Sequence, residues 1–137
     1  MGTGLRIHGV RGNEEVRLAF IRYAKWLRKE YDFPIRVRVY LSPRALLTKM
    51  NGGTASATFL APFSRRIEPY IRVATGDYPE VKLERGRDDA LAEFLVALSH
   101  EVIHYQQWIR TGNPSERGVA AKAFRMVDRY ATTVDAP

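Results

Sequence analysis

The sequence has no cysteine among its 137 residues. This absence excludes a disulfide framework, a thiolate nucleophile and every zinc or iron site that depends on cysteine ligands. Histidine is scarce as well, with three in the whole chain. Any metal site must therefore be built from histidine and carboxylate side chains.

Long apolar runs are also missing. No stretch approaches the roughly 18 uninterrupted apolar residues that mark a membrane-spanning helix. Residues 1–10 contain two basic side chains and no continuous apolar segment, so they do not resemble a secretory signal. We therefore expect a cytoplasmic protein without a membrane anchor.

What remains is the composition of a globular domain. Hydrophobic residues make up 45% of the chain and charged residues 27%, which is too apolar for a disordered protein. The length is close to the commonest size of one domain, and no repeat, low-complexity segment or linker divides the sequence. We predict a single domain over residues 1–137.

The chain is basic, with 22 lysines and arginines against 15 acidic residues. The arginines are spread from the N-terminal third to the last predicted helix, without a concentrated block. Neither an RNP-like signature nor a helix-turn-helix pattern is present. The sequence alone therefore makes nucleic-acid binding an unfavoured alternative, although Arg36, Arg38 and Tyr40 would share one face of a predicted strand.

The hydrophobic pattern predicts alternating helices and strands. Apolar residues recur at three- and four-residue spacing after the capping residue Asn13, and they alternate with polar ones over residues 35–41. A short helical piece, a turn at 51–53 and a strand pair should follow. The expected elements are helices at 14–31, 42–49, 88–110 and 116–132 and strands at 35–41, 54–60 and 67–75.

These elements predict an α+β fold. A small antiparallel or mixed sheet of about three strands would pack against an N-terminal helix, a long central helix and a C-terminal helix. In the central helix, Leu91, Leu95 and Leu98 begin an apolar stripe, and Gly112 can take the left-handed position that ends it.

The central helix contains the pattern HExxH, at His100, Glu101 and His104. Four residues on a helix correspond to about 400 degrees of rotation, so both imidazoles project from one side and can bind one zinc ion. Glu101 is offset by one residue and can act as general base on a zinc-activated water. The alternative is a helix that merely carries two surface histidines.

A catalytic zinc needs a third protein ligand and a position left for water. No histidine follows His104, so the third ligand must be a carboxylate from Glu116, Asp128 or Asp135. Glu116 is favoured because it lies across a turn that would fold the last helix back beside the motif. The simpler alternative is that Glu116 only stabilises a helix N-terminus after Ser115.

The run ALSHEVIHYQQW at 97–108, the strand pattern at 68–76 and Glu116 together resemble the minigluzincin-like proteins. These are very small prokaryotic metallopeptidases of the gluzincin type, within the broader zincin group, and the resemblance covers about residues 35–132. It implies a minimal catalytic domain with one Zn²⁺ per chain, held by His100, His104 and Glu116, while Glu101 activates water.

The resemblance also implies a sheet whose edge strand pairs with an extended peptide. We expect this strand at 67–75, and the substrate-binding residues would be Tyr70, Ile71, Arg72 and Val73. One departure stands out, because gluzincins often place a polar residue shortly after the glutamate ligand, where this chain has Val119 and Ala120. Another residue must then orient the histidines.

Three hypotheses follow from the sequence. The leading one is a zinc-dependent metallopeptidase, a hydrolase acting on a peptide or protein substrate. The second is a latent or non-catalytic zinc-containing domain that binds a peptide or protein. The third is a basic nucleic-acid-binding domain in which the metal site is secondary.

Overall fold

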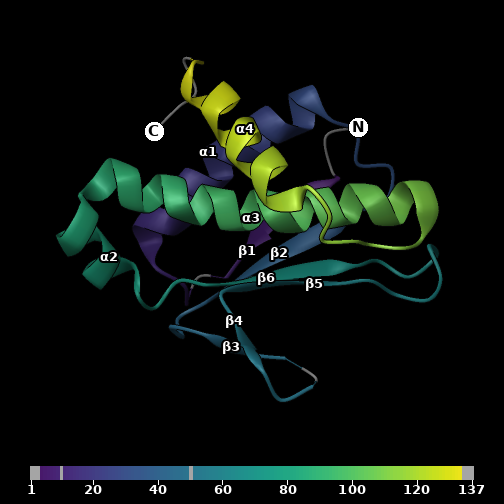
Figure 1. Cartoon of the computed structure of the whole chain (residues 1–137), viewed down its shortest axis with the longest axis horizontal. Helices are drawn as coiled ribbons and strands as arrows, with labels where there is room; N and C mark the ends of the chain where they lie inside the picture. The colour runs from purple at the N-terminus through teal and green to yellow at the C-terminus, as the bar shows by residue number, and fades with distance from the viewer. Residues whose placement is uncertain (1–3, 10, 50, 134–137) are drawn as a thin grey trace.

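The computed structural model describes residues 4–9, 11–49 and 51–133 of the chain (Figure 1). These residues form the predicted α+β class, with four helices, a four-stranded sheet and a separate two-stranded hairpin. The elements, in chain order, are β1 (Leu5–His8), α1 (Glu14–Glu30), β2 (Val37–Ser42), β3 (Leu47–Thr48), β4 (Thr54–Ala55), β5 (Ala57–Leu60), β6 (Tyr70–Ala74), α2 (Tyr78–Arg85), α3 (Arg87–Thr111) and α4 (Val119–Ala131).

The main sheet is mixed, with strand order β1-β2-β6-β5. Strands β1, β2 and β6 run parallel, and β5 pairs antiparallel with β6. Leu5, Val39 and Ile71 point toward the helices and are fully buried. The mixed sheet confirms the prediction, but it has one strand more than expected, because four residues at β1 give too short an alternation to recognise in the sequence.

Helices α1 and α3 pack on one face of this sheet, and α4 packs mainly on α3 (Figure 1). The predicted caps are present at two helix ends. Asn13 Oδ1 accepts a hydrogen bond from the Val16 amide at 3.2 Å at the start of α1. Gly112 adopts φ +78° after α3, and its amide donates to the Trp108 carbonyl at 2.9 Å.

The predicted helix at 42–49 is wrong. Its first part continues alongside β6, where the amides of Thr75 and Gly76 donate to the carbonyls of Ser42 and Arg44, both at 2.8 Å. Its last part is β3, which forms a hairpin with β4 around the predicted turn. Long-range backbone pairing thus outweighs the weak local preference for a helix.

The segment between the last predicted strand and the predicted central helix, for which no helix or strand is expected, forms α2. Tyr78 is its one buried residue and packs edge-to-face against Phe94 of α3. A helix of eight residues that buries a single side chain has almost no periodic signal. Its packing on α3 explains why it forms.

The last helix begins at Val119 rather than at the predicted residue 116. Gly118 adopts φ +72°, a left-handed conformation that separates the preceding turn from the helix. The Ser115 hydroxyl therefore does not cap α4 and instead accepts a hydrogen bond from the Arg117 amide at 3.2 Å. Glu116 consequently lies in the connection between α3 and α4.

Candidate metal centre

His100 and His104 lie one turn apart on α3, and both line a cleft between this helix and β5. Their ring centroids are 4.9 Å apart, and the side chains are 30% and 8% exposed. Just before them, the buried Ser99 hydroxyl donates to the Leu95 carbonyl and accepts a hydrogen bond from the Tyr23 hydroxyl of α1. This contact fixes α3 against α1 at the residue that precedes His100.

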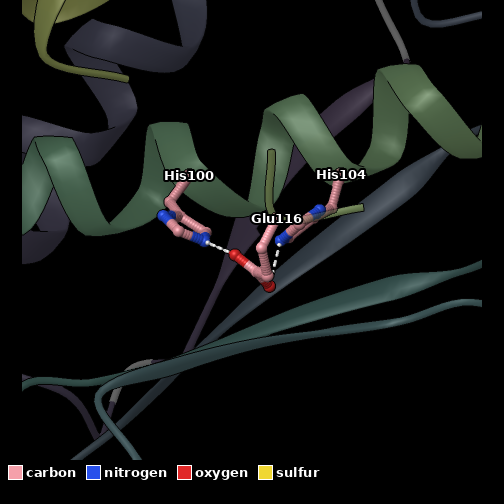
Figure 2. A group of neighbouring side chains, drawn as sticks. All are labelled: His100, His104 and Glu116. Atoms are coloured by element: carbon pink, nitrogen blue, oxygen red, sulfur yellow. Dashed lines mark hydrogen bonds and ion pairs between the residues drawn. The ribbon is translucent and has the colours of Figure 1, made fainter. Parts of the chain in front are cut away.

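Glu116 reaches both histidines from the α3–α4 connection (Figure 2). Its Oε1 lies 2.8 Å from Nε2 of His100, and its Oε2 lies 2.9 Å from Nε2 of His104. One ligand atom from each residue falls within 4.8 Å of the others. The structure therefore brings together the three residues that the sequence assigned to a metal, although Glu116 comes from a loop rather than from a helix face.

Gln107 orients His104. Its Oε1 accepts a hydrogen bond from the Ser115 amide at 2.8 Å and lies 3.0 Å from Nδ1 of His104. Because the amide of Ser115 can only donate, the atom between them is an acceptor, and Nδ1 carries a proton. Gln107 therefore orients His104, a role for which the positions shortly after Glu116 offer no polar side chain. Its position three residues after His104 on the same helix is the sequence signal for this contact.

His104 consequently faces an acceptor at both ring nitrogens. Nδ1 donates to Gln107, while Nε2 points at a carboxylate oxygen of Glu116. A neutral imidazole with its proton on Nδ1 has only a lone pair at Nε2, which a carboxylate oxygen would repel. The geometry needs positive charge at this point, supplied by a second proton on the ring or by a cation shared with Glu116.

The donor set therefore fits a divalent metal ion. Two imidazole nitrogens and one carboxylate oxygen are the ligand types that catalytic zinc sites use, with a further position for water. A bound cation would supply this positive charge in place of a proton. Burial opposes the ionisation of Glu116, but the hydrogen bond from His100 and the charges of both histidines outweigh it and lower its pKa.

Glu101 lies beside this group and is only 7% exposed. Burial raises the pKa of its carboxyl above the ordinary value, His100 and His104 oppose the rise, and the charge of Glu116 adds to it. A carboxyl with a raised pKa is a stronger base once ionised. The side chain lines the space in front of the histidines, where such a base can be used.

A cleft of about 410 Å³ separates this group from the sheet edge. Its wall on the helix side consists of His100, Glu101, His104 and Glu116, and β5 contributes Ala57, Thr58 and Phe59 on the other side. A neighbouring hollow of about 310 Å³ continues past His100 and Glu101, and it is lined by Ser56, Val96, Ala97, Ala120 and Phe124 among others. The arrangement leaves an open channel along β5.

The prediction that the strand at 67–75 lies at the edge of the sheet is wrong. Strand β6, which carries Tyr70, Ile71, Arg72 and Val73, pairs with β2 on one side and β5 on the other, so its main chain has no free edge. Ile71 and Val73 are buried beneath the helices, while Tyr70 and Arg72 point to the opposite face. The edge strand at the cleft is β5, which the sequence pattern could not distinguish from β6.

Of the other carboxylates considered as ligands, Asp128 does not join the centre. Asp128 is exposed on α4 and is not a member of the His100, His104 and Glu116 cluster. Asp135 lies outside the described residues.

Comparison with known proteins gives no match among family models, curated proteins or solved structures. In the part of the chain that the structure describes, none of the helices combines the length and apolarity needed to span a membrane.

Proposed function

We propose that this protein is a zinc-dependent metallopeptidase of the minimal gluzincin type, with a zincin-like arrangement of helices and sheet. The observation that carries the proposal is the convergence of His100, His104 and Glu116 beside the buried Glu101. Two histidines and one glutamate are the ligands of gluzincin zinc sites, and Glu101 occupies the general-base position of HExxH. One Zn²⁺ per chain is expected.

Zinc, when bound to these residues, supplies a Lewis acid that polarises a peptide carbonyl and lowers the pKa of water. Gln107 holds the proton on Nδ1 of His104, which would leave the lone pair of Nε2 available to the ion. Glu116 contributes negative charge and is kept near both histidines by the Ser115–Gln107 hydrogen bond. These residues would hold the ion, and the cleft leaves their side toward β5 open.

Glu101 performs the proton transfer in the proposed reaction. Its carboxylate takes a proton from the attacking water as the water oxygen forms a bond to the carbonyl carbon. The same proton then passes to the nitrogen of the breaking C–N bond, which leaves as an amine. Burial suits Glu101 to this role because a raised pKa makes its carboxylate a stronger base, which takes up the proton and keeps it until the second transfer.

Strand β5 is the element proposed to align the peptide. It is the outer strand of the sheet, and its main chain borders the cleft opposite the metal ligands. An extended peptide can pair with such an edge, which places its carbonyl groups at regular intervals along the channel. The small side chains of Ser56 and Ala57 leave room for the chain to approach.

The test compares Glu101→Gln with Glu93→Gln, a control on the same helix whose side chain pairs with Arg85 at the surface. Zinc per chain is measured by elemental mass spectrometry, and hydrolysis with a fluorogenic library of unstructured peptides. We expect both variants to retain zinc and only Glu101→Gln to lose hydrolysis. Turnover by Glu101→Gln would remove the residue from the base role, and zinc without turnover in the unmodified protein would instead support a non-catalytic peptide-binding domain.

A further inference from the structure

The main sheet has a second face, which the helices do not cover. In Figure 1, helices α1, α3 and α4 lie on one side of the sheet, and the β3–β4 hairpin lies on the other. Alternate residues of the four strands point to this second side, and they are exposed or half-buried. We call this surface the open sheet face; it comprises Arg6, His8, Arg38, Tyr40, Thr58, Leu60, Tyr70 and Arg72.

Aromatic rings cross the open sheet face on three neighbouring strands. The strand register places His8 beside Tyr40. Their ring centroids are 5.5 Å apart, and those of Tyr40 and Tyr70 are 5.9 Å apart. Tyr40 is 39% exposed although it occupies a central strand. Rings in this position offer surfaces on which flat ligands can stack.

Arginines accompany these rings. The register places Arg6 beside Arg38 and Arg72 beside Tyr40, so the cationic groups alternate with the rings across the strands. Glu68 lies 3.8 Å from Arg36 and 3.9 Å from Arg38, and its single charge can offset only one of the two. The open sheet face is therefore cationic, which favours a ligand with repeated negative charges.

The face continues into a hollow of about 340 Å³ beside the hairpin. Lys49, Asn51, Tyr70 and Arg72 contribute to its lining. A volume of this size is at the lower end of small-ligand pockets, which run from about 300 to 1,000 Å³. It combines an aromatic ring, an amide and two cationic groups, which match a base and its phosphate.

We infer that the open sheet face binds single-stranded nucleic acid. The tyrosine rings stack on unpaired bases, and Arg6, Arg38 and Arg72 contact the phosphates. A duplex fits less well, because its bases are already stacked and the described part of this flat face presents no helix that could enter a groove. An anionic membrane fits less well too, because Leu60 is the one large aliphatic side chain on the face.

The test titrates the whole chain into a fluorescein-labelled single strand of about 12 nucleotides, in DNA and RNA form, and follows anisotropy at about 50 mM salt and above. Tyr40→Ala should weaken binding by about fivefold or more, since one stacked base contributes about 1–3 kcal/mol. Tyr40→Phe retains the ring and should restore binding. Arg38→Gln should lower the slope of affinity against salt by about one.

The matched charge control is Arg22→Ala, an exposed arginine of α1 on the helical side. It should change affinity by less than about twofold, because it removes one positive charge outside the face. His100→Ala should also leave binding intact, which separates this inference from the metallopeptidase proposal. Circular dichroism establishes whether each variant is folded. If Tyr40→Ala does not fold, the binding measured for Arg38→Gln tests the inference.

Four results would overturn the inference. The first is no binding at low salt, and the second is an equal loss for Arg22→Ala and for the variants of the face. The third is equal or tighter affinity for a duplex of the same sequence. The fourth is binding to anionic phospholipid vesicles without binding to single strands.

Discussion

His104 donates its Nδ1 proton to Oε1 of Gln107, and this one contact defines which nitrogen remains for a metal. The same oxygen accepts a hydrogen bond from the Ser115 amide, so Gln107 orients His104 and also holds the loop that carries Glu116. A change at Gln107 should therefore act on two ligands at once.

Gln107→Ala is expected to weaken zinc binding by about 10- to 100-fold, the usual effect of losing an orienting partner of a histidine ligand. Gln107→Glu keeps an acceptor at the same position and should recover most of the affinity. Competition with a chromogenic chelator measures both. Gln106→Ala, at the next position and lining a different cavity, is the control; an equal loss there would show that the effect is not specific to the contact with His104.

Glu116→Ala is expected to lower zinc affinity by more than the roughly 100-fold upper range for an orienting residue, since it removes a ligand itself. Asp128→Ala removes the same charge from α4 and should have no effect. The zinc content per chain and competition with a chelator measure zinc binding by each of the two variants. Zinc also stabilises the folded chain by mass action, so the unfolding temperature should rise with zinc for Asp128→Ala and much less for Glu116→Ala. Equal behaviour of the two variants would exclude Glu116 as a ligand.

Gly118→Ala is expected to destabilise the chain by about 1–2 kcal/mol, because a residue with a Cβ disfavours the left-handed conformation seen at φ +72°. An added Cβ would meet nothing within 4 Å, so the cost arises from the backbone alone. Gly118→Asn should lose less stability than Gly118→Ala, because asparagine tolerates this conformation. Urea unfolding measures both; an unchanged midpoint for Gly118→Ala would show that the α3–α4 connection tolerates another conformation.

The ionisation of Tyr105 is expected to destabilise the folded chain at alkaline pH. Burial raises the pKa of this residue from 10.0 to about 12, while the hydrogen bond that its hydroxyl accepts from the Ile35 amide favours the ionised form and offsets part of this rise. The folded state thus holds the proton more tightly than the unfolded chain.

The resulting contribution to stability is complete below pH 10 and is lost as the pH rises toward about 12. Tyr105→Phe should be less stable at neutral pH, because the Ile35 amide loses an acceptor at 3.1 Å, but its stability should fall less steeply above pH 10. Urea midpoints across this range give the two slopes. Parallel curves for the variant and the unmodified protein would contradict the assignment.

Local patterns accounted for much of the fold. The seventeen-residue helix α1, its cap at Asn13 and the end of α3 at Gly112 follow from neighbouring residues, and the structure has them. The short elements β1, β3 and α2 were missed because they have too few residues to show a period, and pairing or packing with distant segments forms them.

The sequence by itself determined the spacing of His100, Glu101 and His104, because the period of a helix places them without reference to the rest of the chain. Tertiary structure decided everything that depends on which segments meet. It made β5 rather than β6 the free edge, joined Gln107 to Ser115, and gathered arginines that are dispersed in the sequence onto one sheet face. Strand order and loop closure arise from long-range hydrogen bonding and core packing, and a local sequence pattern contains no information about these contacts.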